Sequence, residues 1–364
     1  MRIGLIAPPW VPVPPVTYGG TELVIDELAR GLQAVGHQVL LAASADSTCP
    51  VPMVPGVRES DFGALNDATS LLSHLIVSYA AMRDVDIIHD HTLGGPLYRG
   101  RPPAIPTVVT NHLPFTDATN VLFRELDRDT TIVAISQNQA SHAIGLTVGA
   151  VIHHGIDVAS VPVGTGQGGF TAVLARMNPS KGIVEALHIA QAAGVPLRIA
   201  AKMREPEELD YFNSEVRPLL TSEHQYLGEL STTDKLALLG EAFALLNPIQ
   251  WSEPFGLTMI EALSAGTPVV GTPRGSAPEI VRHGLTGFLA NTDELVQLLP
   301  KAAELDRAVC RAEAESRFTS RRMVDDHIRL YSKILTGAAG QPPLRRDDAV
   351  SVVRHSSDQH QPNR

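Results

Sequence analysis

The 364-residue sequence predicts an α/β protein with two doubly wound parallel sheets that face each other across a cleft. Short β-branched runs alternate with amphipathic helical stretches along most of the chain, and this alternation is typical of parallel sheets with helical crossovers. The alternation is interrupted by the Gly- and Pro-rich segment SVPVGTGQGG at 160–169 and then starts again. We therefore predict an N-terminal domain over 1–160 and a C-terminal domain over 168–317.

Each predicted element follows from its local pattern. In the first helix, 20–36, apolar residues recur at helical spacing, namely Leu23, Leu28, Leu32 and Val35. The other N-terminal helix is expected at 66–82, and the strands at 2–7, 38–43, 85–90, 105–110, 130–135 and 150–154. In the C-terminal half we predict strands at 170–175, 196–201, 224–228, 242–249 and 267–272, and helices at 182–193, 205–220, 231–241 and 256–266.

A final helix is predicted over 318–335, with Met323, Ile328, Tyr331 and Ile334 on one side. The residues beyond it, 336–364, are polar and lack periodicity. Such a segment has too little apolar surface to form a core, so we expect a disordered tail.

The composition limits the classes of function. With 44% hydrophobic and 19% charged residues the chain is typical of globular proteins, and its net charge of −10 argues against a nucleic-acid partner. The two cysteines, Cys49 and Cys310, have no metal-ligand spacing and no disulfide framework, which favours a reducing compartment. The sequence contains neither a signal-type apolar run nor a stretch long enough to span a membrane. We predict a cytoplasmic protein and leave peripheral membrane contact open.

The segment WSEPFGLTMIEALSAGTPVV, 251–270, combines two functional signals. A helix follows a buried strand, and the free amides of a helix N-terminus at the carboxyl edge of a parallel sheet suit a phosphate group. Two carboxylates, Glu253 and Glu261, lie on either side of that helix start with seven residues between them. The alternative is structural: Pro254 and Gly256 only shape a turn, and Glu253 is a favourable charge near a helix start.

The loop LARMNPSKG, 174–182, should lie at the same edge because it follows the first strand of the second half. Arg176 and Lys181 would supply a forked donor and a flexible point charge, both suited to phosphate oxygens, although an ordinary basic loop is the alternative. With the helix amides they would form a diphosphate site. Carboxylates repel phosphate, so the two glutamates should instead accept hydrogen bonds from flanking hydroxyls. A nucleotide sugar has this arrangement of groups.

The first half offers two further candidates. The loop APPWVPVPPVTYGGTE, 7–22, ends in Gly19 and Gly20 at a helix start, where two glycines permit close backbone approach to a ligand, although many such turns are structural. His112, in VVTNHLPF, lies where a strand becomes a loop and should face the cleft. The alternative for His112 is a hydrogen-bonded histidine at the sheet edge.

The motif HDHT, 89–92, suggests a metal site at first sight. Successive strand residues point to opposite faces, however, so His89, Asp90 and His91 cannot easily converge on one ion. We therefore predict no metal site.

Together these motifs resemble the retaining nucleotide-sugar glycosyltransferases of family 4 (glycosyl transferases group 1), which have the GT-B fold of two Rossmann-like domains. The resemblance spans about 1–335. It is based on Gly19-Gly20, the sequence TNH ending at His112, Arg176 with Lys181-Gly182, and Glu253-x7-Glu261 followed by EALSAGTPVV. The last segment is highly specific, and the others are moderately so.

The resemblance implies roles for the matching residues of the C-terminal half. Arg176 and Lys181 would hold the donor diphosphate, Glu253 the sugar hydroxyls and Glu261 the ribose hydroxyls. The backbone amides that would line the phosphate and the sugar are those of Phe255, Gly256 and Leu257.

In the N-terminal half, Gly19 and Gly20 would approach the diphosphate when the cleft closes. His112 would lie beside the transferring sugar, bind its hydroxymethyl group and stabilise developing positive charge. The last helix would cross back onto the first domain. The chain departs from the family at His154, where relatives commonly have Asn, so we assign no role to that residue.

The implied activity is transfer of a hexose, with retention of configuration, from a nucleotide diphosphate sugar to an unidentified acceptor hydroxyl. UDP-glucose is the expected donor; the acceptor would be a small molecule, a glycan or a lipid-linked sugar, and no metal or cofactor would be needed. The alternatives are a nucleotide-sugar epimerase on the same fold and a non-catalytic sensor. An NAD-dependent oxidoreductase is disfavoured, because G-x-G-x-x-G is lacking. The sequence leaves the oligomeric state open.

Overall fold

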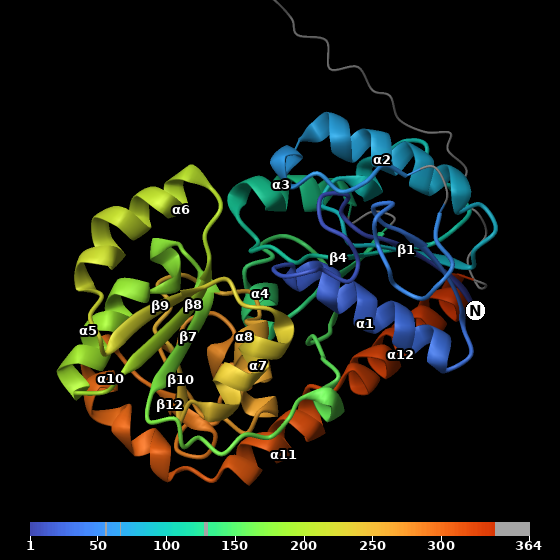
Figure 1. The fold of residues 1–364 in the computed structure, drawn as a ribbon. Helices are drawn as coiled ribbons and strands as arrows, with labels where there is room; N and C mark the ends of the chain where they lie inside the picture. Colours follow the sequence, from blue (N-terminus) through green and yellow to red (C-terminus); the bar gives the residue numbers. More distant parts are fainter. Residues whose placement is uncertain (55–56, 66, 127–129, 339–364) are drawn as a thin grey trace, which may run out of the picture.

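The computed structural model describes residues 1–54, 57–65, 67–126 and 130–338 and contains two lobes, each built on a six-stranded parallel sheet (Figure 1). The strand order is β2-β1-β3-β4-β5-β6 in the first sheet and β12-β11-β10-β7-β8-β9 in the second. In both sheets the order reverses next to the first strand of the lobe. The predicted architecture of two doubly wound sheets is confirmed.

The first lobe buries the middle of its sheet on both faces. Its strands are β1 (Arg2–Ile6), β2 (Gln38–Ala42), β3 (Ile87–Asp90), β4 (Thr107–Thr110), β5 (Thr130–Ala134) and β6 (Val148–Val151). Every residue of β3 and β4 is buried, as expected for parallel strands covered by helices on both sides. The helices are α1 (Gly20–Ala34), α2 (Ala68–Ala81), α3 (Asp117–Leu126) and α4 (Gln137–Ser141).

The second lobe repeats this plan. Its strands are β7 (Thr171–Arg176), β8 (Leu197–Lys202), β9 (His224–Gly228), β10 (Ala244–Asn247), β11 (Val269–Gly271) and β12 (Gly287–Leu289). Its helices are α5 (Ile183–Ala193), α6 (Pro206–Tyr211), α7 (Thr232–Glu241), α8 (Leu257–Ser264), α9 (Ala277–Ile280), α10 (Thr292–Leu298) and α11 (Arg307–Arg317).

Two groups of elements differ from the prediction. The single helix expected over 205–220 is α6 followed by a π turn over Phe212–Val216 and a 3-10 turn over Arg217–Leu219. Pro218 contributes to the break, because it has no N–H to donate to the carbonyl four residues earlier and so interrupts the α-helical hydrogen bonds. The sequence pattern also missed α3, α4, α9, α10, α11 and β12. These elements are short or mostly polar.

The last helix, α12 (Ser320–Ala338), leaves the second lobe and packs along α1 of the first (Figure 1). Its residues Met323, Val324 and Tyr331 are buried in the core of the first lobe. Within the described residues the chain crosses between the lobes twice, and the two crossings are hydrogen-bonded to each other. Ile156 N donates to Phe318 O at 2.9 Å, and Ser320 N donates to Ile156 O at 2.8 Å. Helix α12 ends at 338 rather than 335, and the rest of the predicted tail, 339–364, lies outside the described residues.

Gly31 sets how closely α12 approaches α1. A methyl group added there would overlap Val324 Cγ2, and the β-branched Val324 has few rotamers with which to move away. Gly31→Ala would normally favour a helix by about 1 kcal/mol. Overpacking costs about 1–3 kcal/mol, so we expect the variant to lower the melting temperature and to speed hydrogen exchange in 320–331. An unchanged melting temperature and unchanged exchange would show that the two helices are not tightly packed.

Candidate active site

The predicted donor-site residues of the second lobe lie on loops at the carboxyl edge of its sheet. Arg176 is the last residue of β7, and Lys181 ends a 3-10 turn, Pro179–Lys181, that follows it. Glu253 lies between β10 and α8, and β10 pairs with β7. Neighbouring parallel strands therefore bring the basic loop and the acidic segment together, as predicted.

Lys181 and Glu253 form the centre of this site. Lys181 Nζ donates a hydrogen bond to Glu253 Oε2 and lies 4.9 Å from the centre of the Trp251 ring. Trp251 Nε1 donates to the same carboxylate oxygen at 2.9 Å. Both charged side chains are largely buried. Trp251 was not among the predicted site residues, although it is the first residue of the acidic segment 251–270.

Two glycines allow the loops around this pair. Gly182 has φ 70°, and a methyl group there would overlap the carbonyl oxygen of Pro248, so the basic loop packs directly on the end of β10. Gly256 precedes α8 with φ 91°. No side chain caps α8, and the first amides of a helix have no intrahelical partner. The start of α8 therefore offers free donors beside Glu253, the partner of Lys181, because a methyl group at Gly256 would lie 3.6 Å from Glu253 Cγ. A phosphate site requires such donors.

Arg176 lies beside a carboxylate that was not among the predicted site residues. Its Nε lies 3.6 Å from Oε1 of Glu208, a buried carboxylate on α6. The second carboxylate oxygen of Glu208 accepts a bond from the backbone of Arg204 at 2.8 Å, and Lys202 Nζ lies 3.5 Å from its Oε1. Burial raises the pKa of Glu208. Arg176 thus contacts this acidic group, whereas Lys181 contacts Glu253.

Glu261 also has an unforeseen partner. It is buried on α8, and its Oε1 lies 2.6 Å from Lys235 Nζ on α7. Glu261 lies one helical turn beyond the start of α8. It therefore follows the proposed phosphate donors on the same helix. Both carboxylates of the Glu253-x7-Glu261 motif therefore have lysine partners in the structure.

The first lobe meets this site at the start of α1. A methyl group added at Gly20 would lie 3.1 Å from Leu257 Cδ1, and Leu257 packs against the cores of both lobes. The loop before Gly20 also crosses between the lobes: Thr17 Oγ1 accepts a bond from Arg204 Nη2 at 2.7 Å. At Gly19 a methyl group would lie 2.6 Å from Pro15 Cβ. Loop packing alone therefore explains the need for glycine at position 19.

Glu22, in the first turn of α1, should make the stability of the protein depend on pH. Burial raises its pKa from 4.5 to about 7. A carboxyl group whose folded pKa is raised favours folding below its unfolded pKa, and this contribution is lost as the pH rises through 7. Between pH 5 and pH 8 the loss amounts to about 3 kcal/mol. The fall in melting temperature over this range should be smaller in Glu22→Gln than in the wild type, and equal falls would contradict the shift.

His112 follows β4 and contacts other histidines. Its Nε2 lies 2.9 Å from His91 Nδ1, and its ring stacks on His154 with centres 5.2 Å apart. The His154 ring lies 5.1 Å from that of Phe255 in the second lobe. Burial, with a smaller effect of nearby His327, lowers the pKa of His112 to about 3. His112 is therefore a neutral side chain connected through His154 to the segment that contains Glu253.

The predicted strand over 150–154 is too long at its end. Strand β6 stops at Val151, so His153 and His154 lie in the segment that leads to the second lobe.

The side chains of the HDHT motif alternate between the two faces of the sheet as expected. The rings of His89 and His91 lie 4.1 Å apart, whereas Asp90 accepts a bond from Tyr79 Oη at 2.6 Å. No group of three His, Cys, Asp or Glu residues within the described ranges could hold a metal ion.

A second contact between the lobes is centred on Glu279 of α9. Its carboxylate accepts hydrogen bonds from the backbone amides of Gln137 at 2.8 Å and Asn138 at 2.7 Å, at the start of α4, and lies 2.8 Å from His153 Nε2. Burial alone would raise the pKa of Glu279, but these hydrogen bonds outweigh it and lower the pKa. The carboxylate is therefore ionised at neutral pH and joins the lobes.

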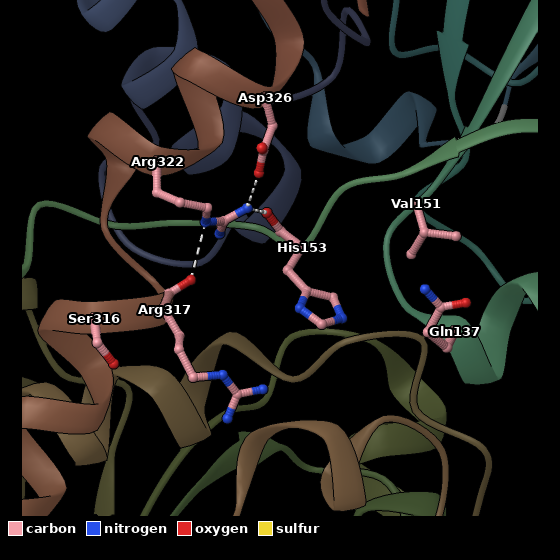
Figure 2. A pocket seen from close by; sticks show the side chains of 7 residues that line it. All are labelled: Gln137, Val151, His153, Ser316, Arg317, Arg322 and Asp326. Carbon is pink, nitrogen blue, oxygen red and sulfur yellow. Dashed lines mark hydrogen bonds and ion pairs between the residues drawn. The ribbon is translucent and has the colours of Figure 1, made fainter. Parts of the chain in front are cut away.

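Beside this contact lies a cavity of about 270 Å³ (Figure 2). Its lining residues are Gln137, Val151, His153, Ser316, Arg317, Arg322 and Asp326. Arg322 bonds to Asp326 at 2.9 Å and to the backbone of His153 at 2.8 Å, so its charge is neutralised within the protein. His153 lines this cavity, whereas its neighbour His154 contacts His112. None of the predicted donor-site residues lines this cavity.

Removing the Glu279 carboxylate should loosen the two lobes. A charged hydrogen bond contributes about 1.5–3 kcal/mol, and Glu279→Ala leaves two amides at the start of α4 without their acceptor. We expect a larger radius of gyration in small-angle scattering and a fall of about tenfold in kcat/KM, because the donor site needs both lobes. Glu304→Ala, at an exposed carboxylate of the same lobe, is the control. A scattering curve and kcat/KM like those of the wild type would rule out the connecting role.

Among the described residues, no helix combines the length and the apolar character that crossing a lipid bilayer requires.

Two family models match the chain, one in each lobe. The model for Glycosyltransferase Family 4 matches residues 18–160, and the model for Glycosyl transferases group 1 matches residues 166–314. The second match contains Arg176, Lys181, Glu253 and Glu261. The first contains Gly19, Gly20 and His112.

Individual proteins agree with these models. The phosphatidyl-myo-inositol mannosyltransferase of Mycobacterium leprae (strain TN) is 25% identical over 378 residues, covering 93% of this chain and 98% of that protein. The N-acetyl-alpha-D-glucosaminyl L-malate synthase of Bacillus anthracis is 32% identical over 120 residues, but this match covers only 30% of each chain.

Solved structures give the same result for the fold. AviGT4, a glycosyltransferase involved in avilamycin A biosynthesis, is 26% identical, with a TM-score of 0.68 over 92% of this chain and 98% of that one. Anabaena HepE in complex with UDP and glucose is 20% identical, with a TM-score of 0.73 over 91% of this chain and 99% of that one. The chain belongs to the GT-B glycosyltransferases of family 4 (glycosyl transferases group 1).

Proposed function

We propose that the protein transfers a hexose from UDP-glucose to an acceptor hydroxyl with retention of anomeric configuration. The observation that carries this proposal is the meeting of Lys181, Glu253 and the uncapped start of α8 opposite Gly20. A cation and free helix amides can neutralise a diphosphate, and a carboxylate beside them can accept bonds from sugar hydroxyls. Few ligands other than a nucleotide sugar need both at this spacing.

In the proposed mechanism the bond between the anomeric carbon and the donor phosphate oxygen breaks. The acceptor oxygen forms the new glycosidic bond on the same face of the sugar, and its proton passes to the leaving phosphate. Arg176, Lys181 and the amides at the start of α8 stabilise the charge that develops on the diphosphate. His112 lies beside the sugar as a neutral group, and Glu261 binds the ribose hydroxyls. The residues supply charge stabilisation in place of a metal ion.

The proposal requires Lys181 and Glu253 to separate when the donor binds. In the unliganded protein they neutralise each other, and both side chains are largely buried. A diphosphate would attract Lys181, and the sugar hydroxyls would replace it at Glu253. The donor therefore exchanges one set of charge-assisted hydrogen bonds for another, which limits the cost of breaking the pair.

We further propose that the first lobe, 1–160, binds the acceptor, that 168–317 binds the donor and that the protein works in the cytoplasm. The buried free thiols of Cys49 and Cys310 support a reducing compartment. The acceptor remains one of three classes: a small molecule, a glycan or a lipid-linked sugar.

The test is a thermal-shift panel of UDP-glucose, GDP-mannose and UDP-N-acetylglucosamine, followed by donor hydrolysis without acceptor. We expect the largest shift with UDP-glucose and slow release of glucose as its α-anomer, detected by NMR. Release of the β-anomer would contradict retention. An epimerase would convert the donor sugar without hydrolysis, and a sensor would show the thermal shift without any product.

A further inference from the structure

Five histidines, His89, His91, His112, His154 and His327, form a continuous set of ring contacts that we call the histidine cluster. The proposed mechanism uses only His112. His112 differs from the others because it is half-buried, whereas the other four side chains are buried. The cluster therefore consists of four buried histidines and one partly accessible histidine, His112.

Within the cluster, His91 forms the only side-chain hydrogen bond that His112 makes among the described residues. His91 Nδ1 and His112 Nε2 are 2.9 Å apart. The other nitrogen of His91, Nε2, is enclosed and has no hydrogen-bond partner within the described residues. His89 does not satisfy it, because its own nitrogens bond to Tyr331 Oη at 2.6 Å and Thr110 Oγ1 at 2.8 Å.

The unpartnered nitrogen decides where the proton lies. A neutral imidazole carries one N–H, and burial keeps the pKa of both His91 and His112 low, so both rings are neutral. If His91 carried its proton on Nε2, an N–H would be enclosed without an acceptor, and orphaned buried N–H groups are rare. With the proton on Nδ1, His91 donates to His112 Nε2, and only a lone pair is enclosed. His112 must then carry its own proton on Nδ1.

The geometry points to His91 as a positioning residue that fixes His112 in the Nδ1–H form, so that His112 presents an N–H donor to a hydroxyl of the transferring sugar. His112 Nδ1 makes no hydrogen bond among the described residues and is not one of the enclosed unpartnered atoms. It is therefore available to a ligand. That His112 meets a nucleotide-sugar donor rests on the proposed function, whereas the tautomer of His112 is a property of the unliganded protein.

Three variants of His91 separate this role from general packing. Asn places its amide near the position of the imidazole Nδ1 and can still donate to His112 Nε2. Gln places its amide near the position of Nε2, and Leu has no donor at all. We expect His91→Asn to retain donor hydrolysis within about twofold, and His91→Gln and His91→Leu to lose about fivefold to tenfold in kcat, the effect of one neutral hydrogen bond. The affinity for UDP should stay the same in all three, because His91 does not approach the diphosphate.

His327→Leu is the matched control, because it removes a buried histidine of the same cluster that contacts His89 rather than His91 or His112. It should lower the melting temperature as His91→Leu does but leave kcat unchanged. Equal kcat values for the Asn and Leu variants of His91 would overturn the inference, as would equal losses in His91→Leu and His327→Leu.

The tautomer can be measured directly in the unliganded wild-type protein. Long-range ¹H–¹⁵N NMR of labelled histidines, with His112 assigned by its loss in His112→Gln, should show the Nδ1–H form in the wild type and a mixture in His91→Leu. An Nε2–H pattern in the wild type would overturn the inference whatever the enzyme does. Absence of hydrolysis and of UDP binding in the wild type would instead refute the proposed function and leave the NMR result standing.

Discussion

Lys181→Ala should lower kcat/KM for the nucleotide sugar by one to two decades. Lys181 pairs with Glu253, which shortly precedes α8, and the loss of a charged hydrogen bond to the leaving diphosphate costs about 1.5–3 kcal/mol. The affinity for UDP should fall as well, because the diphosphate alone makes this contact. Steady-state kinetics with the best donor and calorimetric titration with UDP, both at one ionic strength, measure the two effects.

The matched control for this variant is Lys333→Ala, which removes an exposed lysine of α12 far along the chain from the predicted site. It should leave both kcat/KM and the UDP affinity unchanged. Wild-type kinetics in Lys181→Ala would remove Lys181 from the donor site. A large loss of thermal stability in Lys181→Ala would indicate that its contact with Trp251 is mainly structural.

Glu253→Gln should also lower kcat/KM by one to two decades. Unlike Lys181→Ala, however, it should not lower the affinity for UDP. The carboxylate is proposed to bind sugar hydroxyls, so the loss of its charge weakens bonds of about 1.5–3 kcal/mol each in the complete donor. UDP has no sugar at this position. The variant also releases Lys181 from its ion pair, so UDP should bind as tightly as to the wild type, or more tightly.

Lys181→Ala should weaken UDP binding and Glu253→Gln should not, so comparing the two variants separates the roles of the two residues. If Glu253→Gln weakened UDP binding as much as Lys181→Ala, Glu253 would act only by holding Lys181 in place. If it changed neither UDP binding nor turnover, the sugar would lie elsewhere. The double variant should lose less than the sum of the two single losses, because the residues contact each other.

The sequence predicted the fold because its strands are short, apolar and regularly separated by amphipathic helices. It also placed the loops around Lys181 and Glu253 together, since the ends of neighbouring parallel strands share one edge of a sheet. The elements it missed are those whose stability comes from tertiary contacts. Helix α11 (Arg307–Arg317) contains few apolar residues, yet Cys310 and Ala314 are buried in the core of the second lobe.

The partners of the predicted residues were harder to find. Glu208 meets Arg176 through the packing of α6 within the second lobe, and Glu279 meets the start of α4 only because of how the two lobes are placed. A lone glutamate in a helix gives no signal of such a contact. Trp251 is different, because its position two residues before Glu253 could have marked it as part of the same loop.

The central claim is that a diphosphate binds between the start of α8 and the first lobe. A crystal structure of the protein soaked with UDP-glucose tests this claim most directly. We predict the two phosphates within hydrogen-bonding distance of Arg176, Lys181 and the amides at the start of α8, with Gly20 facing them. An empty gap, or a bound nucleotide from which Arg176 and Lys181 are turned away, would contradict the account.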